Sequence, residues 1–359
     1  MKKKVVFIIN NLTGGGAERV ISIISDYLVN HGYDVTILML RGDKCVYKIN
    51  SKVKRIIRYD YEPHDALKQI RYLRKYYKAH PDAIFVSFLR SQNLYSLIAA
   101  VGTKAKIVFS ERMTPVKFSF KNFINSAEFK LLMFFAHTNR CKKIVFQSKS
   151  AADGYPKTLK KKGIVIPNPL NDNMPQPYSG ERKKNIVAVG RLSYQKNYKL
   201  LIDAFAKFSK INPGYTLQIY GKGALQSKLQ NYTEKLGLKE KVELCGFCSD
   251  VHEKIVDAGM YVMSSDYEGL SNALLEAMAL GIPTISTDHP PGSAKEYIKN
   301  YDNGILIPVR DTEALFGAMC YISNNTDKAD EMGKRASEIR NAISSSVIGE
   351  KWKSLFETL

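Results

Sequence analysis

The most informative stretch of the sequence is YEGLSNALLEAMALGIP, which runs from Tyr267 to Pro283 and places Glu268 and Glu276 eight positions apart. Glu268 precedes the glycine-bearing start of a predicted helix, and Glu276 stands two turns along that helix. Free backbone N–H groups at a helix start can receive phosphate, and carboxylates accept hydrogen bonds from sugar or ribose hydroxyls. The stretch therefore predicts a site for a phosphate and for sugar or ribose hydroxyls, at a strand-to-helix turn.

Strand and helix patterns alternate on both sides of this stretch. In the second half, strands are predicted over 185–190, 216–220, 242–244, 260–263, 284–286 and 304–307, with helices over 199–210 and 224–236. In the first half, strands are predicted over 4–10, 34–40, 53–57, 83–88, 106–110, 143–146 and 163–166, with a helix over 17–30. Buried strands separated by amphipathic helices are typical of a parallel, doubly wound α/β sheet.

The length of the chain favours two such domains. Its 359 residues exceed what one core usually supports, since roughly 100–200 residues per domain is the norm. Residues 167–180 concentrate Pro, Asn and Gly, which is the composition of a linker. We therefore expect a Rossmann-like domain over 1–166 and a second one that starts at residue 181.

Composition narrows the class of protein further. The apolar runs, such as 131–136, are far shorter than the roughly 20 residues of a membrane-spanning helix, and residues 2–10 fit a first strand better than a signal peptide. Five cysteines, three of them isolated, favour a reducing cytosol over a disulfide framework. Cys245 and Cys248 lack a second ligand pair, so we interpret them as packing residues rather than as zinc ligands.

The positive charge is concentrated in the first half. Residues 1–165 hold 31 Lys and Arg against 11 Asp and Glu, a net charge of +20, whereas the rest of the chain is neutral. Such an excess attracts polyanions or an anionic membrane face, although a merely solvated surface is the alternative. Aromatic residues interleave with basic ones over 67–78 and 118–135, which suits a bilayer interface and equally suits ordinary helix packing. No nucleic-acid-binding motif is present in the sequence.

Two further glycine-bearing turns follow predicted strands. Gly14 to Gly16 precede a helix, where bare backbone and the helix N-terminus can receive a phosphate. The pattern is not the dinucleotide fingerprint, and the second strand ends without an acidic residue for ribose, which counts against a dehydrogenase. Gly190 is followed by Arg191 and, five residues later, Lys196, two cations that can clamp a diphosphate.

Together these motifs resemble family 4 of the retaining glycosyltransferases, which have the GT-B fold. The resemblance is closest to the bacterial subgroup that elongates lipid-linked sugars for capsule, O-antigen or protein glycosylation. It implies two Rossmann-like domains facing across a cleft, with a nucleotide-sugar donor in the domain over 181–342, an acceptor in the basic first domain, and a last helix over 343–359 that crosses back to the first domain. The motifs that carry it are Gly14–Arg19, Ser110–Arg112, Ile166–Pro169, Val189–Leu192 with Lys196, Tyr220–Gly223, Leu244–Phe247, and Glu268 with Glu276.

The resemblance also implies roles for these residues. Arg191 and Lys196 would hold the donor diphosphate, Glu268 the transferred sugar and Glu276 the ribose hydroxyls. The further donor-binding residues are Gly15 and Gly16 near the phosphates, Gly221, Gly223 and Phe247 beside the base, and Gly269, Leu270, Ser271 and Asn272 at the helix start. The reaction would retain anomeric configuration by front-face displacement without a protein nucleophile, with the two cations stabilising the departing diphosphate.

The first domain departs from the family pattern at one position. Many relatives have a His after the Ser-Glu pair, whereas this chain has Arg112. Because an arginine cannot act as a general base, we expect Glu111 and Arg112 to orient the acceptor or the donor. We interpret His137, His252 and His289 as structural or exposed rather than catalytic, although His289 lies near the family's donor loop. No Asp-x-Asp occurs in the sequence, so neither a metal nor a cofactor is expected.

Three functions stay open at this stage. The leading hypothesis is transfer of a hexose or N-acetylhexosamine, with UDP-sugar as donor, to a polyprenyl-diphosphate-linked glycan. The expected location is cytoplasmic, at the inner face of the cytoplasmic membrane. A UDP-sugar 2-epimerase shares the two-domain plan but needs no acceptor. A non-catalytic basic adaptor at a membrane surface is the third, and the intact phosphate clamp argues against it.

Overall fold

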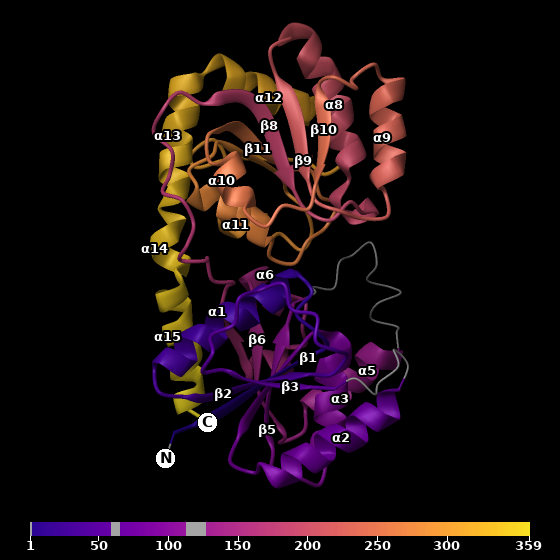
Figure 1. Cartoon of the computed structure of the whole chain (residues 1–359), viewed down its shortest axis with the longest axis vertical. Helices are drawn as coiled ribbons and strands as arrows, with labels where there is room; N and C mark the ends of the chain where they lie inside the picture. Colours follow the sequence, from indigo (N-terminus) through magenta and orange to yellow (C-terminus); the bar gives the residue numbers. More distant parts are fainter. Residues whose placement is uncertain (1, 59–64, 113–126) are drawn as a thin grey trace. The chain divides into compact units, whose positions relative to one another are not determined.

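The computed structural model describes residues 2–58, 65–112 and 127–359. The chain divides into two compact units, residues 1–171 with 343–359 and residues 172–342 (Figure 1). The boundary between residues 171 and 172 lies inside the linker expected over 167–180, and the second unit ends at residue 342. Each unit is built on one parallel sheet, and every predicted strand is present.

The first unit contains a seven-stranded parallel sheet in the order β3-β2-β1-β4-β5-β6-β7. Its strands are β1 (Lys4–Ile9), β2 (Asp34–Met39), β3 (Lys54–Ile57), β4 (Ile84–Phe88), β5 (Lys106–Glu111), β6 (Cys141–Phe146) and β7 (Gly163–Val165). Its helices are α1 (Gly16–Asn30), α2 (Ala66–Ala79), α3 (Arg90–Ala100), α5 (Ala127–Ala136), α6 (Lys149–Asp153), α7 (Lys157–Lys160) and α15 (Ser345–Glu357). The central strands read as continuous apolar runs because helices cover both faces of a parallel sheet.

The last helix of the chain, α15, belongs to the first unit and packs against α1, as the expected fold class requires (Figure 1). Trp352 and Phe356 are fully buried, and the ring of Trp352 lies 6.2 Å from that of Phe88 at the end of β4. A Cβ at position 349 would lie 2.2 Å from the ring of Tyr27 on α1, so glycine permits the close approach of the two helices.

Helices α2 and α5 use their apolar residues differently. On α2, Leu73 and Tyr77 are fully buried, so its aromatic stripe serves helix packing. On α5, Leu131 and Phe134 are 46% and 67% exposed. Residues 118–126 of the second basic, aromatic stretch lie outside the described residues. One apolar residue of α2, Leu67, is 69% exposed, whereas α5 presents two exposed apolar residues three positions apart.

The second unit contains a six-stranded parallel sheet in the order β10-β9-β8-β11-β12-β13. Its strands are β8 (Lys183–Val189), β9 (Thr216–Tyr220), β10 (Val242–Gly246), β11 (Ala258–Met263), β12 (Thr284–Thr287) and β13 (Ile305–Ile307). Its helices include α8 (Tyr198–Ile211), α9 (Gln226–Lys235), α10 (Val251–Ile255), α11 (Asn272–Ala279), α12 (Thr312–Asn324) and α13 (Thr326–Ser337), followed by α14 (Ile339–Ile343).

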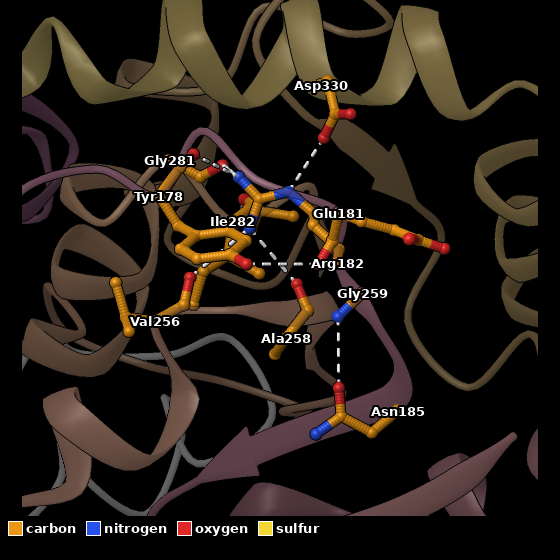
Figure 2. Close-up of polar contacts among 11 residues, drawn as sticks. Tyr178, Glu181, Arg182, Asn185, Val256, Ala258, Gly259, Gly281, Ile282 and Asp330 are labelled. Atoms are coloured by element: carbon orange, nitrogen blue, oxygen red, sulfur yellow. Dashed lines mark hydrogen bonds and ion pairs between the residues drawn. The ribbon is translucent and has the colours of Figure 1, made fainter.

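Arg182, just before β8, ties four parts of the second unit together (Figure 2). Its Nη2 donates to the carbonyl of Gly281 at 2.6 Å, its Nη1 reaches the carbonyls of Val256 and Ala258, and its Nε pairs with Asp330 on α13 at 2.8 Å. One largely buried guanidinium thus satisfies carbonyl oxygens at the start of β11 and in the turn before β12.

We expect Arg182→Met to destabilise the protein by about 3 kcal/mol, because buried carbonyls would lose their donor. Asp330→Asn is the matched control: Asp330 is exposed, so its ion pair should contribute about 0.5 kcal/mol. The measurement is the urea midpoint of both variants. Equal midpoints would contradict the role given to Arg182.

Candidate active site

The candidate site lies at the carboxyl ends of β8 and β11. These two strands are neighbours, and the strand order reverses between them, since β9 lies beyond β8 and β12 beyond β11. The loops that follow such strands diverge and leave a crevice, which is where open α/β sheets bind ligands. The loop after β8 carries Arg191 and Lys196, and the loop after β11 carries Glu268.

An ion pair joins the two loops. Nζ of Lys196 lies 2.6 Å from Oε1 of Glu268, and the side chains are only 14% and 11% exposed. Ser265 donates its hydroxyl to the same carboxylate oxygen at 2.9 Å, and the hydroxyl of Ser264 donates to the Lys196 carbonyl. A nearly buried pair with added hydrogen bonds holds both charges in a fixed place.

Asn197, the residue after Lys196, also links the two loops. It has left-handed backbone geometry, with φ of 44°, and its side-chain oxygen accepts from the Leu200 amide at the start of α8. Its amide nitrogen donates to Asp266 at 2.8 Å. The turn therefore ends one loop, caps the next helix and binds the opposite loop.

Three glycines allow the loops after β8 and β9 to approach each other. A Cβ at Gly221 would lie 1.9 Å from the carbonyl oxygen of Gly190, and one at Gly223 would lie 2.3 Å from that of Leu192. The amide of Gly190 also donates to the carbonyl of Tyr220 at 2.9 Å. Gly221 and Gly223, which the resemblance assigns to the base, thus lie where the backbone of the loop after β9 contacts the backbone of the loop after β8.

His289, on the loop after β12, is buried beside this ion pair. Its Nδ1 lies 3.3 Å from the carbonyl of Pro290, and the Glu268 amide donates to that same carbonyl. Burial lowers the pKa of His289 below its ordinary value, while the charge of Glu268 opposes this shift. Ser293 donates its hydroxyl to the carbonyl of Gly269. The loop after β12 therefore fixes the backbone around Glu268.

Tyr198, the first residue of α8, lies beside Gly190. The side chain is buried, and among the described residues its hydroxyl has no hydrogen-bond partner. Burial raises its pKa well above the ordinary value, and the charge of Glu268 raises it further. A Cβ at Gly190 would lie 3.0 Å from this hydroxyl and 2.8 Å from Cε of Lys196. Glycine at position 190 thus leaves room for both side chains.

Helix α11 carries Glu276 and begins after Ser271, which caps it. The hydroxyl of Ser271 accepts from the Leu274 amide, as an N-cap residue does. Gly269, Leu270 and Asn272 complete this start, and Glu276 lies buried on the second turn.

Sequence reasoning did not identify the partner of Glu276. His252 on α10 lies with its Nε2 2.9 Å from the carboxylate. An isolated His between two predicted strands offers no periodic or motif signal, so only the structure reveals this pair.

The remaining candidates of the second unit are on exposed loops. Arg191 and Phe247 are exposed, so the structure does not bring them into the contacts around Lys196. Cys245 and Cys248 are free thiols. Within residues 2–58, 65–112 and 127–359, no group of three or more His, Cys, Asp or Glu side chains is arranged to hold a metal ion.

In the first unit, the glycine turn follows β1, again where the strand order reverses. Gly14 has a φ of 105°, and Gly15 lies at the N-cap of α1 with its carbonyl accepting from the hydroxyl of Tyr47 at 3.0 Å. A Cβ at Gly15 would lie 2.3 Å from the carboxylate of Glu18. Gly16 begins the helix. The turn thus lies at the carboxyl edge of the first sheet, as predicted.

Glu111 and Arg112 lie at the end of β5, within a buried polar cluster. Glu111 is 1% exposed and accepts from the hydroxyl of Tyr155. Arg112 donates to the side chain of Asn168, and its guanidinium lies 4.9 Å from the ring of Phe88. Burial lowers the pKa of Arg112 to about 9, while the charge of Glu111 opposes this shift. Glu111 and Arg112 therefore hold Tyr155 and Asn168 in place, and the Glu111 carboxylate is buried.

Comparison with known proteins identifies the class. Residues 14–173 match the family model "Glycosyltransferase Family 4", and residues 171–339 match the model "Glycosyl transferases group 1". Together the two models account for both units. The chain is a glycosyltransferase with the GT-B fold.

The chain is also similar to individual glycosyltransferases over most of their length. The chain is 29% identical, over 88% of its length and 88% of the relative's, to the N-acetylgalactosamine-N,N'-diacetylbacillosaminyl-diphospho-undecaprenol 4-alpha-N-acetylgalactosaminyltransferase of Campylobacter jejuni. A second transferase of that organism, which acts on a longer undecaprenol-linked glycan of the same kind, is 25% identical over 98% of both chains. The structure of Anabaena Alr3699/HepE in complex with UDP superposes with a TM-score of 0.80 at 16% identity, covering 100% of both chains.

Proposed function

We propose that this protein is a retaining glycosyltransferase that moves a hexose or N-acetylhexosamine from a UDP-sugar to a polyprenyl-diphosphate-linked glycan. The observation that carries the proposal is the Lys196–Glu268 pair at the carboxyl edge of the second sheet. Glu276 lies on the helix that follows, where we assign it to the ribose hydroxyls of the donor. The undecaprenol-linked substrates named for the Campylobacter relatives support the acceptor class.

The proposed chemistry is electrostatic. Nζ of Lys196 has three donors, so it can contact the donor diphosphate while it keeps its contact with Glu268. Arg191 adds a second cation from the same loop, and the two charges stabilise the negative charge that develops as the diphosphate departs. Glu268 accepts a hydrogen bond from a hydroxyl of the transferred sugar. The acceptor hydroxyl attacks the anomeric carbon from the face that the diphosphate leaves and gives its proton to the departing diphosphate oxygen, so no protein nucleophile is required. Arg191 and Lys196 supply the positive charge that a metal would otherwise provide.

A thermal-shift series tests donor binding. We expect UDP and UDP-sugars to raise Tm, GDP and ADP to raise it less, and EDTA to leave these shifts unchanged, because a ligand that binds only the folded state stabilises it by mass action. Loss of the UDP shift in EDTA would contradict metal independence. No shift with any nucleotide would favour the adaptor hypothesis.

We also propose that the first unit docks on an anionic bilayer through α5. Leu131 and Phe134 are its exposed apolar residues, exposed Lys130 lies beside them, and residues 1–165 carry a net charge of +20. Apolar side chains flanked by cations suit the headgroup region of an anionic leaflet. Within the described residues no helix is long and apolar enough to span a bilayer.

Replacing Leu131 and Phe134 together by Ser should weaken binding to vesicles containing phosphatidylglycerol by about tenfold, because the buried apolar area would be lost. Ile211→Ser, which alters an exposed apolar residue of the second unit, is the control and should leave binding unchanged. Rising salt should also release the protein from the vesicles. Equal binding to neutral vesicles would contradict this docking mode.

A further inference from the structure

His252 and Glu276 form a buried pair across two helices. Nε2 of His252 lies 2.9 Å from Oε2 of Glu276, and the two residues are 8% and 7% exposed. Because an ionised carboxylate only accepts hydrogen bonds, the proton between these two atoms belongs to the imidazole. His252 is therefore the donor and Glu276 the acceptor.

Buried apolar residues of both helices hold this pair in place. Helix α10 is anchored by Val251 and Ile255, which are buried on either side of His252. Helix α11 begins at Asn272, and its residues from Leu274 to Ala279 are all buried. The pair is thus part of the folded second unit. Its two helices follow β10 and β11, whose carboxyl ends lie at the same edge of the sheet as the candidate site.

A free carboxylate rotates broadly about its last torsion angle. A hydrogen bond to one oxygen fixes the plane of the carboxylate, and so fixes the directions in which its remaining lone pairs point. A carboxylate that is oriented in advance binds hydroxyl groups more tightly, because less freedom is lost on binding.

We propose that His252 is a positioning residue that orients Glu276 toward the ribose hydroxyls of the donor nucleotide. This inference rests on the proposed function, in which Glu276 binds ribose. Phe247, which the proposed function places beside the base, is exposed five residues before His252 on the same segment. In this proposal the segment from β10 to α10 carries both Phe247, which lies beside the base, and His252, which orients the carboxylate that binds ribose.

Isothermal titration with UDP and 2′-deoxy-UDP tests this role, because the ratio of the two dissociation constants measures recognition of the ribose 2′-hydroxyl. A hydrogen bond to a charged group corresponds to about tenfold in affinity, so the wild type should prefer UDP by about tenfold. In His252→Leu the ratio should fall to about two. His252→Gln, whose amide nitrogen can occupy the position of Nε2, should restore most of it.

A control variant and a transfer assay complete the design. Glu253→Gln changes an exposed neighbour on α10 and should keep the wild-type ratio. In a transfer assay, His252→Leu should raise the donor KM and leave kcat within about twofold, because His252 acts on the ribose end and not on the reacting atoms.

A folded His252→Leu variant that keeps the full ratio would overturn the inference. If that variant does not fold, His252→Gln and His252→Asn decide, because the shorter Asn amide cannot reach the carboxylate; equal ratios for these two would overturn it. Glu276→Ala separates the two levels of the argument. If Glu276→Ala keeps the wild-type ratio, or if the wild type does not bind UDP, the proposed function fails at that site and not only the role of His252.

Discussion

Replacing Lys196 by alanine is expected to lower kcat by about a hundredfold to a thousandfold, which is the usual effect of removing one group that stabilises transition-state charge. Lys196 lies against the backbone of Gly190 and 2.6 Å from Glu268, so no other cation can take its position without rearrangement. Steady-state transfer from a UDP-sugar measures the effect.

Lys199→Ala is the matched control for this variant. Lys199 lies three residues away on α8, is largely exposed and pairs with Asp203, so its loss should leave kcat unchanged. Because Lys196→Ala leaves the Glu268 carboxylate without its partner, the double variant Lys196→Met with Glu268→Gln removes both charges and separates lost catalysis from lost stability. A folded Lys196→Ala protein with normal kcat would refute the role of the ion pair.

Gly221→Ala should lower kcat by about a hundredfold, since a displacement of about 1 Å in an active site can slow the reaction by that factor. The added Cβ would lie 1.9 Å from the carbonyl oxygen of Gly190, and the backbone at Gly221 has a φ of 150°, which favours glycine. The loop after β8, which carries Arg191 and Lys196, must therefore move. Steady-state transfer from a UDP-sugar measures the change.

Gly317→Ala provides the control. Gly317 lies in α12, and a Cβ there would meet no atom within 4 Å, so alanine should stabilise the helix slightly, by about 0.5–1 kcal/mol. An unchanged kcat in Gly221→Ala would contradict the rigid packing of the two loops against each other.

The sequence is sufficient to predict the architecture because each strand is a short apolar run between amphipathic helices. The placement of Lys196 and Glu268 near each other also follows from sequence, since both stand just after predicted strands of one parallel sheet. Their direct ion pair does not follow, because it depends on loop contacts such as the one from Asn197 to Asp266.

Other features of the site depend on contacts between distant residues. His252 and Glu276 are 24 residues apart, and nothing in the local pattern of α10 indicates a polar partner. The tight contact between Gly221 and Gly190 likewise requires knowledge of how two loops cross. Conversely, the aromatic stripe of α2 fits both a membrane interface and helix packing by sequence, and the burial of Leu73 and Tyr77 decides for packing.

The most direct test of the central claim is the fate of a radiolabelled sugar. Purified protein is incubated with UDP-glucose, UDP-galactose, UDP-GlcNAc or UDP-GalNAc, with and without an undecaprenyl-diphosphate-linked glycan, and label in the lipid fraction and in free sugar is measured. The account predicts that one donor labels the lipid fraction, that UDP release requires the acceptor, and that the new linkage keeps the anomeric configuration of the donor. UDP release without acceptor, accompanied by a 2-epimerised sugar, would contradict it and identify an epimerase.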